Sequence, residues 1–173
     1  MIIRRENAVR LLGRGLTVRG PQLAVGQAAP DFELTTNNWQ TATLADYRGK
    51  IKLVSVVPSL DTRVCDMQTR RFNEAAANLS ENVVVLTVSA DLPYAQRRWC
   101  GNAGIDRVQT LSDHKNMNFG DAYGVHIEDL RLDQRSVFVI DAQDTLVHVE
   151  YVLEFSDQPN YDAAMTAALN ALP

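Results

Sequence analysis

Cys65 is the residue of this sequence best placed to act as a nucleophile. It follows an apolar, β-branched run over residues 51–57 and precedes a helical pattern of apolar residues at positions 72, 75, 76 and 79. Cys65 is therefore expected where a buried strand ends and a helix begins. The free N–H groups and positive dipole end of a helix N-terminus stabilise a thiolate over a thiol. Thr62 adds a hydroxyl to the same turn, and Pro58 fixes the backbone where the strand leaves the sheet.

Each candidate also has a simpler structural interpretation. A cysteine after an apolar strand is often just a small buried hydrophobic residue, and this applies to Cys65 and to the second cysteine, Cys100. Arg135 directly precedes the apolar run 136–140. Taken alone, it is equally an exposed arginine at a strand edge or the cation of a site. His114, His126 and His148 show no metal-ligand spacing, so we interpret them as ordinary loop or strand residues.

The composition is typical of one folded domain spanning residues 1–173. The chain is 46% hydrophobic with a formal net charge of −4, and its lysines and arginines are scattered. We therefore expect no nucleic-acid partner and no binding to an anionic membrane. No apolar run approaches the roughly 20 residues of a membrane span. Charges at positions 4–6 interrupt the apolar start, so we expect no secretory signal and a cytoplasmic location, where thiols are kept reduced.

The predicted elements begin with a β-hairpin extension over residues 1–27 and continue as alternating strands and helices. The strands are predicted at 8–12, 16–19, 32–35, 39–44, 51–57, 83–88, 108–111, 136–140 and 146–152, and the helices at 64–79, 93–100, 119–123 and 161–172. Asn160 or Asp157 is expected to cap the last helix. Strands 51–57 and 83–88 are apolar nearly throughout, as parallel strands covered on both faces are. The order is similar to that of a thioredoxin-like α/β fold, with a central mixed sheet flanked by helices.

The Pro58-x-x-x-Thr62-x-x-Cys65 spacing resembles the active-site motif of the peroxiredoxins. The wider stretch 58–73, with Gln68, is most similar to one branch of them, the atypical two-cysteine bacterial thiol peroxidases. The match continues through residues 89–96 to Cys100. It also takes in segments 29–32 and 123–125 and the C-terminal Tyr161, so it covers nearly the whole chain.

This resemblance implies a thiol-dependent peroxidase that needs no metal, haem or flavin. The Cys65 thiolate would attack the distal oxygen of hydrogen peroxide or an organic hydroperoxide and become a sulfenic acid. The Thr62 hydroxyl, the backbone N–H groups of residues 63–65 and the Arg135 guanidinium would stabilise the developing negative charge. Cys100 would attack the sulfenic acid and form a disulfide with Cys65 within one chain. The resemblance also implies thioredoxin as the reductant and a homodimer.

A disulfide between Cys65 and Cys100 makes a geometric demand. Their Cα atoms must approach within about 7 Å, yet the two residues are expected at the ends of different helices. We therefore expect local unwinding at one or both cysteines during turnover. Arg63 and Asp66 depart from the usual pattern of the branch, as does Val57 before the proline. A cation beside the thiolate favours ionisation and an anion opposes it, so their net effect on Cys65 stays open.

Three expectations concern packing around these residues. Met67 is expected in the wall of the Cys65 pocket or, with more weight, in the core. Trp99 is expected to pack near Cys100. Trp39 and Tyr94 are apolar residues that would suit contact with a partner subunit.

Two other functions compete with a peroxidase. A thioredoxin-like thiol–disulfide oxidoreductase is disfavoured because the chain lacks the Cys-x-x-Cys motif that places both sulfurs in one helical turn. A non-catalytic redox sensor, whose oxidation alters binding to a partner, stays open. Rapid catalytic turnover of peroxide with a thiol reductant would separate the enzyme from the sensor.

Overall fold

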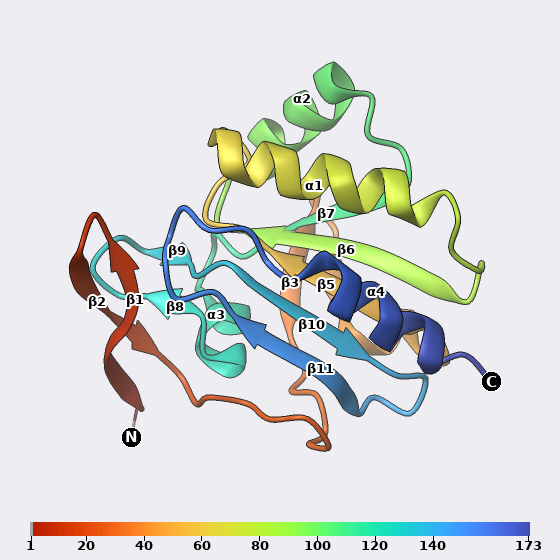
Figure 1. The fold of residues 1–173 in the computed structure, drawn as a ribbon. Helices are drawn as coiled ribbons and strands as arrows, with labels where there is room; N and C mark the ends of the chain where they lie inside the picture. Colours follow the sequence, from red (N-terminus) through yellow and green to blue (C-terminus); the bar gives the residue numbers. More distant parts are fainter. Residues whose placement is uncertain (1) are drawn as a thin grey trace.

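The computed structural model describes residues 2–173, and Figure 1 shows strands at the centre with helices on both faces. The strands are β1 (Arg4–Leu11), β2 (Arg14–Arg19), β3 (Glu33–Thr36), β4 (Thr41–Thr43), β5 (Ile51–Val56), β6 (Val83–Ser89), β7 (Val108–Ser112), β8 (His126–Ile127), β9 (Leu132–Asp133), β10 (Ser136–Ile140) and β11 (Leu146–Tyr151). The helices are a 3₁₀ turn, η1 (Leu44–Tyr47), and four α-helices, α1 (Arg63–Ala76), α2 (Pro93–Ala103), α3 (Asn118–Tyr123) and α4 (Tyr161–Asn170).

The main sheet has seven strands in the order β11-β10-β5-β6-β7-β3-β4. Strands β5, β6 and β7 pair in parallel, and all other pairs in this sheet are antiparallel. Parallel neighbours need crossover connections, which α1 and α2 supply. The carboxyl ends of β5 and β6 therefore lie side by side at one edge, and the turn that carries Cys65 follows directly from β5.

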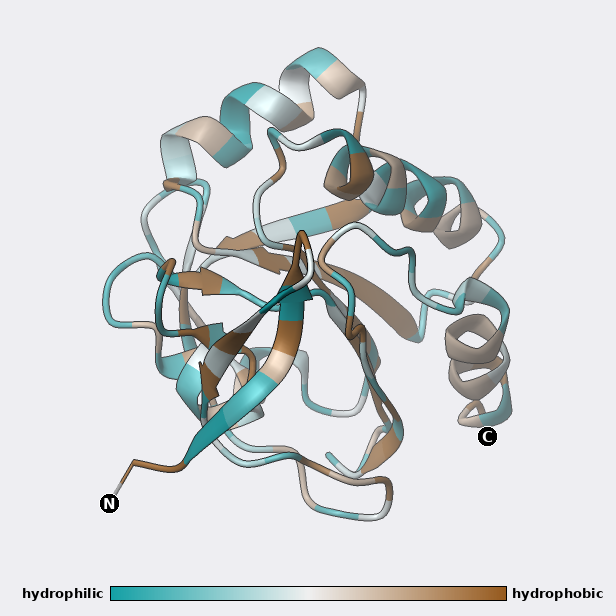
Figure 2. Cartoon of the chain, turned by 60° about the vertical axis from the view of Figure 1, so that its left-hand side comes forward, coloured by the Kyte–Doolittle hydropathy of each residue, from teal (hydrophilic) through white to brown (hydrophobic). Residues whose placement is uncertain are grey.

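Alternation along the central strands divides the core into two layers. In β5, Leu53 packs with Phe72 of α1 and Ala164 of α4. Its neighbour Val54 faces the other way and packs with Phe119 of α3. Successive side chains of a strand point to opposite faces, so a continuous apolar run serves both layers. Figure 2 shows the result, with brown central strands and paler or teal outer helices.

The N-terminal hairpin pairs with β8 and β9 in a separate four-stranded sheet. The predicted hairpin is confirmed, but β1 begins at Arg4 rather than at residue 8. A register shift between Arg5 and Val9, with Asn7 at φ 57°, breaks the alternation that would reveal the first half of the strand. Strands β8 and β9 have two residues each, too short for a periodic pattern, and were not predicted.

Helix ends account for most other differences from the predicted elements. Helix α1 ends at Ala76 rather than residue 79, and α4 ends at Asn170 rather than residue 172. Helix α2 runs through Gly101 to Ala103 and ends at Gly104, which adopts a left-handed conformation at φ 66°. Asn160 is the cap of α4, because its side chain accepts a hydrogen bond from the Ala163 N–H. Within residues 2–173, no helix is long and apolar enough to cross a membrane.

Candidate active site

Cys65 lies in the first turn of α1 and is fully buried. Strand β5 ends at Val56, and the chain then turns through residues 57–62 before α1 starts. The first helical hydrogen bond runs from the Asp66 N–H to the Thr62 carbonyl at 2.9 Å. The predicted strand-to-turn-to-helix setting of Cys65 is therefore what the structure contains. The sulfur shares a small cluster with Val57 and Leu60, against which Trp99 packs.

The Thr62 hydroxyl is in hydrogen-bond contact with the sulfur. Its Oγ1 lies 2.7 Å from Cys65 Sγ and 3.1 Å from the Ser59 carbonyl oxygen. A hydroxyl has one proton, so it donates to only one of these acceptors at a time. When the sulfur is a thiolate, the proton points to Sγ; when the sulfur is a thiol, the hydroxyl accepts from it and donates to Ser59. Thr62 can therefore serve both states of Cys65 without moving.

Arg135 supplies the cation at the site. Its side chain is only 1% exposed, and Nη2 lies 3.4 Å from Cys65 Sγ and 3.2 Å from the Phe155 carbonyl oxygen. Arg63 and Arg70, which also flank Cys65 in the sequence, are exposed. The interpretation of Arg135 as an exposed arginine at a strand edge is thus wrong. A buried guanidinium in contact with sulfur offers hydrogen-bond donors in a fixed geometry.

Gln68 orients Arg135, and sequence reasoning assigned it no role. Its Oε1 accepts from Arg135 Nη1 at 2.7 Å, and its Nε2 donates to Ser55 Oγ at 2.7 Å. Both of these side chains are buried. Gln68 is three residues after Cys65, so the two lie on one face of the helix. That spacing is the signal in the sequence that could have found it.

The turn before α1 is held in place by Asp91, which follows β6. Its carboxylate accepts hydrogen bonds from Ser59 Oγ at 2.7 Å, from the Leu60 N–H at 2.8 Å and from Ser89 Oγ at 2.8 Å. Pro58, immediately before Ser59, is buried. Asp91 thereby fixes the Ser59 carbonyl that Thr62 contacts. The adjacent carboxyl ends of β5 and β6 explain the contact, since residues following parallel neighbours meet at one edge.

Cys100 lies apart from this group. Its half-buried thiol has Sγ 3.5 Å from Thr110 Oγ1 of β7, and burial raises the pKa of the thiol. It lines a cavity of about 500 Å³ together with Asn37 and Thr110. Both cysteines are free thiols. The structure thus brings Cys65, Thr62, Arg135 and the Pro58 turn together but does not bring Cys100 to them.

One expectation about a neighbouring side chain is wrong. Met67 is 50% exposed rather than in the core, because Cys65, Gln68, Thr69 and Phe72 occupy the inward face of α1. Trp99 packs against the Cys65 cluster, and its Nε1–H donates to Asp66 at 3.1 Å. Its packing near Cys100 stays a prediction.

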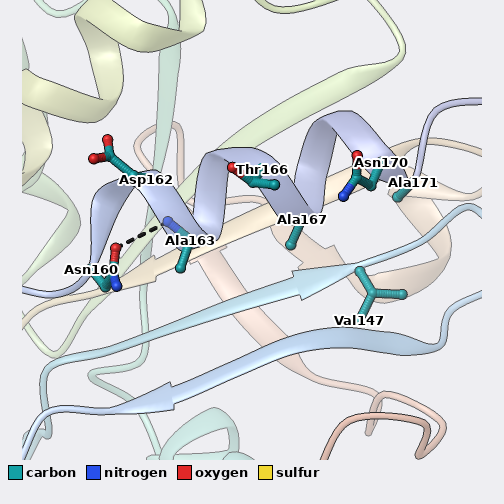
Figure 3. Close-up of a pocket in the computed structure, with 8 residues that line it drawn as sticks. All are labelled: Val147, Asn160, Asp162, Ala163, Thr166, Ala167, Asn170 and Ala171. Carbon is teal, nitrogen blue, oxygen red and sulfur yellow. Dashed lines mark hydrogen bonds between the residues drawn. The ribbon is translucent and has the colours of Figure 1, made fainter.

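The other hollows offer less chemistry. A hollow of about 750 Å³ lies along α4 and is lined by the helix and by Val147 of β11. Figure 3 shows that its polar side chains are Asn160, Asp162, Thr166 and Asn170, and Asn160 is engaged in the helix cap. Within residues 2–173, no three His, Cys, Asp or Glu side chains are grouped as a metal site requires. The group around Cys65 is therefore the candidate active site.

Comparison with known proteins shows the family of the chain. A model of the AhpC/TSA family matches residues 25–149, more than half of the chain. A thiol peroxidase of Halalkalibacterium halodurans is 52% identical over 165 residues, covering 95% of this chain and 99% of the relative. A thiol peroxidase of Bacillus subtilis is 54% identical over 156 residues, covering 90% and 93%.

Solved structures agree on the fold. A peroxiredoxin-like protein from Aquifex aeolicus has a TM-score of 0.89 and 35% identity, covering 96% of this chain and 98% of that one. A thiol peroxidase from Chromobacterium violaceum has a TM-score of 0.83 at 20% identity, covering 94% and 95%. The predicted thioredoxin-like fold is confirmed. The chain belongs to the AhpC/TSA family of peroxiredoxins, and it is a peroxidase of the peroxiredoxin type.

Proposed function

We propose that this protein reduces hydrogen peroxide and organic hydroperoxides through a sulfenic acid at Cys65, that Cys100 resolves it as an intrachain disulfide, and that thioredoxin recycles the disulfide. The observation that carries the first step is the position of Cys65 Sγ, 2.7 Å from Thr62 Oγ1 and 3.4 Å from Arg135 Nη2. A thiolate held between a hydroxyl donor and a guanidinium is an activated nucleophile.

In the first step the sulfur is oxidised and the peroxide is reduced. The Cys65 thiolate gives an electron pair to the distal oxygen, the S–O bond forms, and the O–O bond breaks. The departing oxygen takes a proton from solvent and leaves as water or alcohol, and Cys65 becomes a sulfenic acid. Negative charge spreads from sulfur over both oxygens in the transition state. Thr62 and Arg135 are the donors aimed at that charge, and Gln68 and Asp91 position them.

In the second step the Cys100 thiolate attacks the sulfur of the sulfenic acid. The S–S bond forms, and the hydroxyl group leaves with a proton as water. The raised pKa of Cys100 keeps it a protonated, unreactive thiol while it is packed against Thr110. It becomes a nucleophile once it moves toward Cys65. Local opening of the two cysteine segments is therefore part of the proposal.

The remaining parts of the proposal concern partners and organisation. A thioredoxin dithiol would reduce the Cys65–Cys100 disulfide, and residues 1–173 would act as one domain with residues 1–27 as a hairpin extension. A homodimer is supported by the exposed rings of Trp39 and Tyr94, whose centroids lie 5.0 Å apart. We place the protein in the cytoplasm, where a thiol reductant keeps both cysteines reduced.

Two cysteine variants test the chemistry. Cys65→Ser should lose peroxidase activity, because a serine hydroxyl is not appreciably ionised at neutral pH; residual turnover above a few per cent would contradict its role as nucleophile. Cys100→Ser should consume one equivalent of peroxide and stop at a sulfenic acid that a dimedone-type reagent traps. Normal turnover of Cys100→Ser with thioredoxin would show that resolution does not depend on Cys100. Steady-state turnover of the wild type also separates the peroxidase from a non-catalytic sensor.

A further inference from the structure

Helices α1 and α2 are joined by two hydrogen bonds. Trp99 Nε1–H donates to Asp66 Oδ1 at 3.1 Å, and one turn further Arg70 Nη1 donates to the Ala103 carbonyl at 3.1 Å. Each pair is 33 residues apart in sequence. Cys65 Sγ contacts Thr62 and Arg135, whereas Cys100 Sγ contacts Thr110 of β7. The two sulfurs therefore have separate polar partners, and the two hydrogen bonds join the helices that carry them.

Three of these side chains form a single cluster, which we call the α1–α2 clasp: Asp66, Arg70 and Trp99. Arg70 Nε donates to Asp66 Oδ2 at 2.9 Å, and its guanidinium carbon lies 5.8 Å from the centroid of the Trp99 ring. One oxygen of the Asp66 carboxylate therefore accepts a hydrogen bond from Trp99, and the other accepts one from Arg70. This anion is directly adjacent to Cys65, and the indole is directly adjacent to Cys100.

Helix α2 buries few of its side chains. Its only buried residues are Pro93 and Gln96, and within residues 2–173 no α2 side chain belongs to either of the two main core layers. The strands beneath it present hydroxyls: Gln96 Nε2 donates to Ser89 Oγ at 3.0 Å, and Cys100 faces Thr110. Helix α1, by contrast, is anchored in the core by Phe72, which is 1% exposed. In Figure 2 the topmost helix, α2, is accordingly mostly teal and pale.

We infer that Asp66, Arg70 and Trp99 are positioning residues that set how fast Cys100 reaches the oxidised Cys65. The inference rests on the proposed resolution by Cys100. The clasp stabilises the packed arrangement, in which the first turn of α1 is formed and Cys65 is ready for peroxide. It must open before α2 can bring Cys100 to the sulfenic acid. Weakening it should therefore speed disulfide formation and leave peroxide attack nearly unchanged, because Thr62 and Arg135 are held by other groups.

Single-turnover kinetics on the reduced full-length protein can test this. One equivalent of hydrogen peroxide is added, and samples are quenched and alkylated over time to follow peroxide loss, Cys65 sulfenic acid and the Cys65–Cys100 disulfide. Arg70→Ala removes the guanidinium from both partners, and Trp99→Phe removes only the N–H donor and keeps an aromatic ring. Each should raise the rate of disulfide formation about three- to tenfold, the size expected for losing a partly exposed charged contact. Arg98→Ala, an exposed arginine of α2, is the matched control and should change neither step.

The salt dependence of the rate of disulfide formation is a second measurement. A purely structural role of the clasp would not change it. The Asp66–Arg70 pair is partly exposed and therefore screened by salt. Disulfide formation in the wild type should speed up between low and high salt, and this dependence should be weaker in Arg70→Ala. Equal or slower disulfide formation in both variants, with unchanged thermal stability, would overturn the clasp. A wild type that forms no Cys65–Cys100 disulfide would instead overturn the proposed resolution step, and the clasp's role with it.

Discussion

Gln68 Oε1 lies 2.7 Å from Arg135 Nη1, and through this contact the first turns of α1 and the start of β10 are joined beside the reactive sulfur. The second guanidinium nitrogen, Nη2, contacts Cys65 Sγ. The amide thus fixes the plane of the guanidinium, which determines where its donors point. Ser55 of β5 holds the other end of the Gln68 amide at 2.7 Å. The cation of the site is oriented by a helix and two strands at once.

Replacing Gln68 by methionine should slow peroxide attack about tenfold. The variant keeps a long, unbranched side chain but removes the acceptor that orients Arg135. The effect should be smaller than that of Arg135→Ala, which removes the donor itself and should cost roughly 10²–10³ in rate, as loss of an aimed donor does elsewhere. Stopped-flow oxidation of the reduced variants is the measurement, with the exposed Gln40→Met as control. An unchanged rate in Arg135→Ala would move the role to another arginine.

The effect of the Thr62 hydroxyl on catalysis should be separable from any effect on the stability of α1. Thr62 stands at the N-cap of α1 but makes no side-chain cap hydrogen bond, so removing its hydroxyl should cost the helix little. Thr62→Val should slow peroxide attack by roughly 10²–10³, and Thr62→Ser should restore most of the rate. Thr69→Val is a matched control, because that buried hydroxyl bonds the Cys65 carbonyl rather than the sulfur. A fast Thr62→Val enzyme would contradict a catalytic hydroxyl.

A buried pair of carboxyl groups predicts how stability depends on pH. Asp133 is fully buried, and neither of its oxygens has a hydrogen-bond partner among residues 2–173. A methyl group on Gly120 would lie 2.6 Å from Asp133 Oδ1 and 3.3 Å from Asp113 Oδ2. The two carboxyl groups therefore lie close to each other beside Gly120. Burial raises the pKa of Asp113 to about 7, and burial with the neighbouring Asp113, Asp121 and Asp91 raises the pKa of Asp133 well above its ordinary range.

The direction of the effect follows from proton binding. Between the ordinary carboxyl pKa of 3.8 and about 7, the folded protein keeps a proton on Asp113 that the unfolded chain has released. The contribution of Asp113 to stability is therefore greatest at low pH and falls as pH rises through this interval. Asp133→Asn cannot ionise at this position. At pH 8 it should be more stable than the wild type by about 1–3 kcal/mol in the free energy of unfolding and should unfold at a higher temperature, and the difference should be smaller at pH 5. Calorimetry measures this, with exposed Asp157→Asn as control; parallel pH profiles would contradict it.

Hydrogen exchange should show which elements open during turnover. In the reduced protein, amides of α2 should exchange faster than those of the second half of α1, because α2 buries only Pro93 and Gln96. Oxidation to the disulfide should lower protection at 62–68 and 94–104, while β5 and β6 hold theirs. Equal protection of both cysteine segments in the two states would mean that no unwinding accompanies the disulfide.

The sequence by itself determined the order of elements and the setting of the nucleophile. Apolar runs and helical periodicity are local properties, so β5, β6 and α1 could be placed to within a few residues. The Pro58, Thr62 and Cys65 spacing lies within one turn, and the structure puts Thr62 in contact with the sulfur as that spacing implies. Very short strands and the ends of helices were harder to predict. Two residues are too few to show an alternating pattern, and tertiary packing decides where a helix ends.

Only the tertiary structure decided which distant side chains reach the sulfur. Arg135 lies 70 residues after Cys65, and its choice over Arg63 and Arg70 depends on the antiparallel pairing of β10 with β5. The clasp and the carboxyl pair of Asp113 and Asp133 likewise join segments far apart in sequence. Contacts of this kind depend on strand order and helix register, which no local pattern encodes. The nucleophile and its hydroxyl partner could therefore be predicted from one turn of the chain. The position of the Arg135 guanidinium beside them depends on how the strands of the sheet pair.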